Sequence, residues 1–183
     1  MSHEESFIIR KRVLKCYIGH DKDVFIPDGV KEIGPGAFDG RRSLAIVNID
    51  PDEKWIEHVI YSNRSDVRSV VIPGSVKKIG SMAFFLCGAL ELITMYPGVE
   101  EIEDCAFLGC ESLVNVTLPE TVTAVDPLAF RGCTKLSLIV IPSADTAIAD
   151  DAFSGCENLT IHAPPGSFTE EYAKKNQITF LPM

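Results

Sequence analysis

Four cysteines recur at a fixed spacing, and they are the residues of this sequence that most resemble a chemical site. Cys87, Cys110, Cys133 and Cys156 lie 23 residues apart. Stacked coils would place them about 4.8 Å apart, and parallel side chains would hold their Cβ atoms near that separation. A disulfide needs Cβ atoms at about 3.8 Å, and zinc needs a tetrahedral rather than a linear set of sulfurs. We therefore expect a column of small buried thiols, with redox or metal roles as the alternatives.

The other candidates for chemistry are weaker. Cys16 and His20 form a lone Cys-x-x-x-His, which is poor support for a nucleophile and its base. Gly34-Pro-Gly36 loosely resembles a phosphate loop, but no strand-to-helix transition surrounds it. The sequence predicts no catalytic residue, no metal ligand and no cofactor. A thiol-dependent enzyme remains the third-ranked alternative.

An internal repeat must position these cysteines, and the Ala-Phe dipeptide exposes it. Five phenylalanines are separated by 46, 23, 23 and 23 residues: Phe38, Phe84, Phe107, Phe130 and Phe153. The double gap predicts a further coil centred on Tyr61, in which Ile60 replaces the alanine and Glu53 replaces a valine. We expect six coils in one continuous stack, because a single coil cannot bury its apolar side alone.

The residue pattern within each coil predicts one long strand and one shorter strand. The segment 113–119 alternates apolar residues with others, as a half-buried strand does, and Pro119 ends it because proline lacks an N–H. A second strand is expected from Val122 to Val125. Glycines such as Gly109 fit the tight corners between the sides of the coil.

Three segments resemble the BspA-like (Treponema-type) leucine-rich-repeat family: residues 72–80, 80–84 and 108–113. The resemblance covers essentially the whole chain. It implies a horseshoe-like or nearly straight β-solenoid used for protein–protein contact, frequently in bacterial or protozoan surface proteins, with no reaction or cofactor. We predict a right-handed leucine-rich-repeat solenoid, mostly β within the α/β-horseshoe class.

A single domain, 1–183, is expected, with an N-terminal cap over 1–22, repeats over 23–160 and a C-terminal cap over 161–183. Phe7–Ile9 and Val13–Leu14 predict a hairpin at the front. At the back, Ser167 and Glu170 match a capping box, so a helix to about Asn176 is expected. That helix should present Phe168, Tyr172 and Ala173 on one face, and 178–180 should add a last extended piece.

Charge and hydropathy narrow the possible partners. The formal charge of −9 opposes nucleic-acid binding and adhesion to an anionic membrane. The sequence shows neither a signal peptide nor an apolar run of about 20 residues that would span a membrane. The expected location is cytoplasmic, or the cell surface if the chain is a fragment or a processed form.

The outward side of the long strands carries the sharpest functional signal. Asp23 is the one formal charge expected there, beside several large apolar residues. One interpretation is that β-branched residues simply suit strands; the other is a contact surface on a repeat scaffold. We favour the second and predict a non-catalytic module that binds a protein or peptide. The alternative is a structural or surface adhesion component that self-associates, for example as a homodimer. The predicted contact residues are Phe25, Ile46, Val71, Leu92, Thr94, Tyr96, Asn115, Thr117, Leu138 and Val140.

Overall fold

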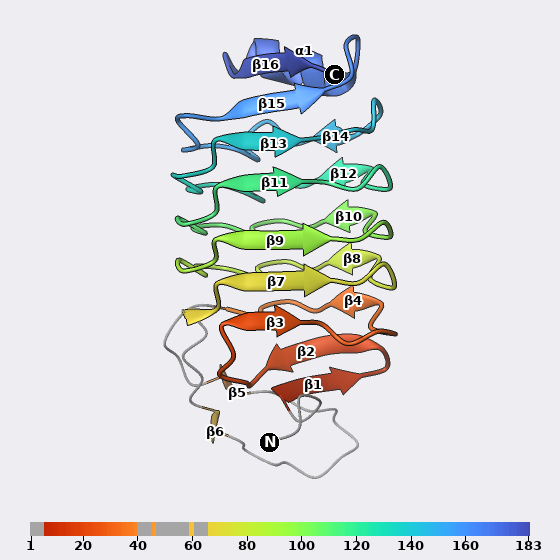
Figure 1. Cartoon of the computed structure of the whole chain (residues 1–183), viewed down its shortest axis with the longest axis vertical. Coiled ribbons are helices and arrows are strands. Elements are labelled where there is room, and N and C mark those ends of the chain that lie inside the picture. Colours follow the sequence, from red (N-terminus) through yellow and green to blue (C-terminus); the bar gives the residue numbers. More distant parts are fainter. Residues whose placement is uncertain (1–5, 40–44, 47–58, 61–65) are drawn as a thin grey trace.

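Inward-facing apolar residues alternate along each strand with outward-facing residues. The chain folds into a stack of coils with a parallel sheet on each of two sides (Figure 1). The computed structural model describes residues 6–39, 45–46, 59–60 and 66–183. One sheet, here called the long-strand sheet, has parallel strands in the order β3 to β16. Its strands are β3 (Asp23–Phe25), β7 (Ser69–Ile72), β9 (Leu92–Met95), β11 (Asn115–Thr117), β13 (Leu138–Val140), β15 (Thr160–Ala163) and β16 (Thr179–Pro182).

The short-strand sheet forms a second side of the same coils. Its parallel strands are β4 (Glu32–Ile33), β8 (Lys78–Ile79), β10 (Glu101–Ile102), β12 (Ala124–Val125) and β14 (Ala147–Ile148). Each strand ends on the buried Ile or Val column, except that Ile148 in the last coil is only partly buried. The predicted leucine-rich-repeat solenoid, mostly β and with about six turns, is confirmed.

A column of stacked aromatic rings runs through the core. Neighbouring ring centroids from Tyr17 to Phe153 lie 4.8–5.3 Å apart. The alanine before each phenylalanine is fully buried, and its carbonyl accepts a hydrogen bond from the aromatic residue of the preceding level at 2.7–2.9 Å. Alanine suits this position because it adds almost no side chain where two levels meet.

The predicted continuous stack through Tyr61 is wrong. Phe38 stacks directly on Phe84 at 4.8 Å, and β3 and β4 pair directly with β7 and β8. Two short strands from the intervening sequence, β5 (Ala45–Ile46) and β6 (Val59–Ile60), pair with each other in antiparallel fashion instead. Tyr61 itself lies outside the described residues, and Tyr17 supplies the additional ring.

Two substitutions in that segment explain why it does not join the stack. Ile60 stands where the other coils have an alanine with no exposed surface, so its larger side chain would collide with the next level. Glu53 stands where four other coils bury a valine, and an unpaired carboxylate is strongly disfavoured at such a buried position. In the sixth coil, Asp145 makes the same departure but is exposed, while Thr146 is buried and donates to Val122 O at 2.9 Å.

The front cap is the predicted hairpin. Strands β1 (Phe7–Arg10) and β2 (Val13–Tyr17) pair in antiparallel fashion, and β2 continues the short-strand sheet beside β4. Lys11 and Arg12 form the turn with φ of 49° and 66°, the left-handed backbone that a tight two-residue hairpin requires.

The rear cap also follows the prediction, with one correction. Helix α1 (Phe168–Lys175) begins at Ser167, whose hydroxyl accepts from the Glu170 N–H at 3.2 Å, and β16 adds to β15 in parallel. Tyr172 and Ala173 are buried as expected, but Phe168 is 61% exposed. Thr169 takes its place, since positions i, i+3 and i+4 share one face of a helix.

The segment between Phe38 and β7 yields a first prediction. Removing residues 41–63, one 23-residue period, would place Phe38 and Phe84 at the regular spacing. We expect the free energy of unfolding to change by no more than about 1 kcal/mol, because the deletion removes, of the described elements, only the short β5–β6 pair, leaves every level of the ring column in place and otherwise alters loop-closure entropy. Denaturant unfolding followed by circular dichroism measures this. A loss of several kcal/mol would mean that the segment contributes a stacked level after all.

Thr169 yields a second prediction. Its hydroxyl is buried without a hydrogen-bond partner in the described part of the chain. Thr169→Val keeps the shape and removes the unsatisfied group, so we expect a gain of about 1 kcal/mol in the free energy of unfolding. Thr169→Ser is the matched control, because it keeps the hydroxyl and should be less stable than the native chain. If Thr169→Val is less stable than Thr169→Ser, the Thr169 hydroxyl does have a hydrogen-bond partner and the prediction is wrong.

Candidate functional site

The outward face of the long-strand sheet is the candidate site. Strand register aligns Phe25, Val71 and Thr94 in one column, and Leu92, Asn115 and Leu138 in the other. The residues between them point inward and are buried, which is the alternation that the sequence predicted. Thr117 and Val140 complete the first column, since they pair with each other across β11 and β13.

Three large side chains stand out from this face. Phe25 is 57% exposed, Leu92 is 54% exposed and Tyr96, just beyond β9, is 56% exposed. Asp23 is the only formal charge among the outward residues of the described strands from β3 to β13, and its carboxylate accepts from Ser69 Oγ at 2.6 Å. The face therefore offers apolar contact area with few charges to desolvate.

Ile46 does not belong to this face, contrary to the prediction. It lies in β5, which pairs with β6 and not with the long-strand sheet. The cause is the same as for Tyr61: the second coil leaves the stack, so its column positions do not align with the others.

The long-strand face extends further than the sequence predicted, since the predicted residues end at Val140 in β13. Strands β15 and β16 extend the two columns by Thr160 and Thr179 on one side and by His162 and Leu181 on the other. The alternation after Leu159 was a usable signal for β15, because Leu159 occupies the same repeat position as Leu136.

The short-strand sheet has the opposite surface chemistry. Lys78 bonds Glu101 at 2.6 Å and Glu103 at 3.1 Å, and Lys77 bonds Glu100 at 2.7 Å. Burial raises the pKa of Glu103, but hydrogen bonds from Lys78 and Ser81 outweigh it and hold the pKa below its usual value. Both sheets belong to the same coils, so strand propensity alone does not account for the uncharged long-strand face.

Two open hollows lie at the carboxyl ends of the long strands. The first, of about 760 Å³, is lined by Phe25, Tyr96, Val71 and Pro73 among other residues. The second, of about 540 Å³, is lined by residues of β9 and β11 and by prolines that follow the strands. Both border Pro97, so they are neighbours along the solenoid.

The cysteine column is the buried packing feature that its spacing predicted. Each thiol donates to the carbonyl of the phenylalanine one level before: Cys87 to Phe38 at 2.8 Å, and Cys110 to Phe84 at 3.2 Å. Cys133 and Cys156 repeat the contact at 3.3 and 3.2 Å. All six cysteines of the chain lie in its described part and are buried, and none forms a disulfide there.

These thiols are poorly suited to nucleophilic chemistry. The neighbouring Cys110 sulfur and burial raise the pKa of Cys133, and the Cys133 sulfur and burial raise the pKa of Cys156. The thiolate is the reactive form, so a raised pKa lowers reactivity. In the part of the chain that the structure describes, no three His, Cys, Asp or Glu residues come together as a metal site.

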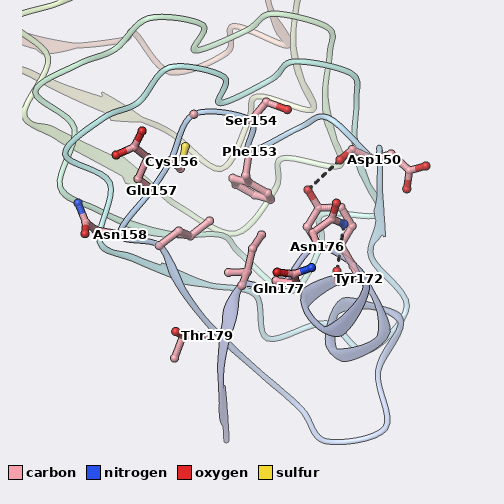
Figure 2. A pocket seen from close by; sticks show the side chains of 13 residues that line it. Asp150, Phe153, Ser154, Cys156, Glu157, Asn158, Tyr172, Asn176, Gln177 and Thr179 are labelled. Carbon is pink, nitrogen blue, oxygen red and sulfur yellow. Dashed lines mark hydrogen bonds between the residues drawn. The ribbon is translucent and has the colours of Figure 1, made fainter.

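A third hollow, of about 580 Å³, lies between the last coil and the rear cap (Figure 2). Tyr172 lines it: its hydroxyl donates to Asp150 O at 3.3 Å and is hydrogen-bonded by the Phe153 N–H. The hydroxyl thereby replaces the alanine carbonyl that a further coil would supply. Burial raises the pKa of Tyr172 to about 12, so it stays protonated at neutral pH. These hydrogen bonds join the rear cap to the last coil, so the hollow is part of the junction between them.

Thiol accessibility provides a third prediction. Under native conditions, the six cysteines should resist a water-soluble alkylating reagent, because all are buried. In denaturant all six should be modified, which mass spectrometry counts directly. One thiol that reacts rapidly in the folded protein would contradict the packing role and support the thiol-enzyme alternative.

Comparison with known proteins places this geometry in a family. A model for the "BspA type Leucine rich repeat region", with six copies, matches residues 16–137 and 54–175. A comparison with curated proteins finds no match. The structure describes no helix long and apolar enough to span a bilayer.

Solved structures of bacterial repeat proteins share the fold. A leucine rich cell surface protein from Faecalibacterium prausnitzii is 30% identical, with a TM-score of 0.70, over 91% of this chain and 39% of that one. A leucine-rich repeat protein from Bacteroides ovatus is 27% identical, with a TM-score of 0.62, over 83% and 36%. The Treponema pallidum leucine rich repeat protein, 23% identical with a TM-score of 0.69 over 86% and 69%, supports the fold alone. The chain thus spans well under half of the first two proteins.

Leucine-rich-repeat scaffolds typically serve protein interaction or adhesion. The repeat pattern is matched over most of the sequence, and the stacked structure agrees with it. The chain belongs to the BspA-type leucine-rich-repeat family.

Proposed function

We propose that this chain is a non-catalytic module that binds a protein or peptide through the face of its long-strand sheet. One observation carries the proposal: the long-strand face is nearly uncharged and exposes large apolar side chains, whereas the short-strand sheet of the same coils carries ion pairs. Contiguous exposed apolar residues are typical of contact surfaces, and repeat proteins bind through extended faces of this kind.

We also propose that the module acts at a bacterial cell surface. The neighbour from Faecalibacterium prausnitzii is described as a leucine rich cell surface protein, and it is similar over 91% of this chain. The earlier expectation of a cytoplasmic location finds no support in the comparisons. Six buried thiols are compatible with a surface location, because burial protects them from oxidants.

A charge-insertion variant tests the binding face. Replacing Val71, Leu92 and Leu138 by lysine adds three charges to the outward columns without touching the buried residues between them. We expect proteins captured by the native chain to be lost, because the contact would require three lysines to be desolvated. Affinity capture from a cell extract, followed by mass spectrometry, measures the loss.

The matched control carries three lysines elsewhere. Met82, Val114 and Phe168 are exposed apolar residues outside the long-strand face, so Met82→Lys, Val114→Lys and Phe168→Lys should leave capture intact. Equal melting temperatures for both triple variants would exclude unfolding as the cause. Undiminished capture by the face variant would overturn the proposal. Light scattering of the native chain separates partner binding from self-association, which predicts dimers without any added protein.

A further inference from the structure

We infer that the segment recognised by this face is a basic, proline-rich peptide in the polyproline II conformation, lying along the solenoid axis in the two hollows beside the long strands. The inference rests on the proposed function and names its ligand class. Its occupant follows from the shape, spacing and charge of the hollows.

The walls of the first hollow suit proline rings. Phe25 and Tyr96 are both more than half exposed and border the same hollow, which Val71 and Pro73 also line. Flat aromatic and proline surfaces with an apolar floor are the features that grooves for proline-rich peptides share. The Tyr96 hydroxyl is a donor at the rim, and a polyproline II backbone has unpaired carbonyls to accept from it.

The spacing of the two hollows matches the repeat of such a peptide. The first hollow spans the levels of β3, β7 and β9, and the second spans those of β9, β11 and β13. If each hollow is taken as centred on its middle level, the two centres are two strands apart, about 9.6 Å at the usual strand spacing. A polyproline II helix advances about 9.3 Å in one three-residue turn. Two prolines three residues apart can each enter one hollow.

The strand ends disfavour an added β-strand as the ligand. Each long strand from β7 to β13 already has a neighbour on both sides, so its ladder groups are paired. Pro73, Pro97 and Pro119 line the hollows and have no N–H to offer. The ligand must therefore bind by surface contact and not by extending the sheet, which suits a polyproline II segment without internal hydrogen bonds.

The charge of the hollows selects basic flanks for the peptide. Asp28 lines the first hollow and Glu120 lines the second, and no Lys or Arg is among the described residues that line either one. Arginines on both sides of the proline core would meet these carboxylates, whereas acidic flanks would be repelled.

Peptide titration tests the inference. The probe is fluorescently labelled Arg-Pro-Leu-Pro-Pro-Leu-Pro-Arg, and binding is measured by fluorescence polarisation with the native chain. Two comparison peptides carry alanine for every proline, or glutamate for both arginines. We expect each comparison peptide to bind at least about tenfold more weakly, since a tenfold change corresponds to the loss of a single modest contact. Raising the salt concentration should weaken the native interaction, because the flanking charges are exposed.

A double variant locates the contact. Phe25→Ala with Tyr96→Ala removes both walls, and we expect an affinity loss of about tenfold or more for the proline-rich probe. Val114→Ala with Phe168→Ala is the control, because both residues are exposed outside the hollows. Circular dichroism and the melting temperature establish that each variant is folded.

Several results would overturn the inference. These are no binding at millimolar concentrations of the probe, equal binding of the alanine peptide, or unchanged affinity of the folded Phe25 and Tyr96 variant. A concentration-dependent dimer that the same variant abolishes would assign the hollows to a second copy of the chain. Suppose that the lysine variant of the long-strand face loses its captured partner while the probe neither binds the native chain nor displaces that partner from it. In that case the proposed function stands and this inference falls.

Discussion

The contact between successive Ala-Phe turns is the constraint on which the rest of this structure depends. Each aromatic N–H reaches the alanine carbonyl of the next level at 2.7–2.9 Å, and the rings stack 4.8–5.3 Å apart. That separation is close to the distance between paired strands, so rings and sheets advance along the solenoid in step. A larger residue at the alanine position would force the levels apart, and the segment with Ile60 is the one that leaves the stack.

The cysteine column follows from the same constraint. A thiol three residues after each phenylalanine fits inside the turn and donates to the carbonyl one level earlier, which a larger side chain could not do. Tyr17 and Tyr172 show how the column ends. The ring of Tyr17 extends the stack at the front. The hydroxyl of Tyr172 accepts from the N–H of Phe153, the last phenylalanine of the column, so each cap supplies one of the contacts that a further coil would make.

The two sheets then divide the surface between them. Buried columns are nearly identical in both, because both must satisfy the same core. The outward positions are not constrained by stacking, and they differ: cross-coil ion pairs lie on the short-strand side, whereas Phe25, Leu92 and Tyr96 are exposed on the long-strand side. Exposed ion pairs contribute little to stability, so this difference between the two surfaces has little effect on folding.

The sequence by itself determined the period, the inward columns and most of the candidate face, because a strict 23-residue spacing leaves one way to align buried residues. It also determined the two caps, because their hairpin and helix-capping signals are local. It could not determine which coils touch, since a degraded coil still keeps the period while its side chains no longer fit. Only the tertiary structure placed Phe38 against Phe84, removed Ile46 from the face and added His162 and Leu181 to it. The hollows likewise exist only in three dimensions, because each is lined by strands that lie at least 23 residues apart in the chain.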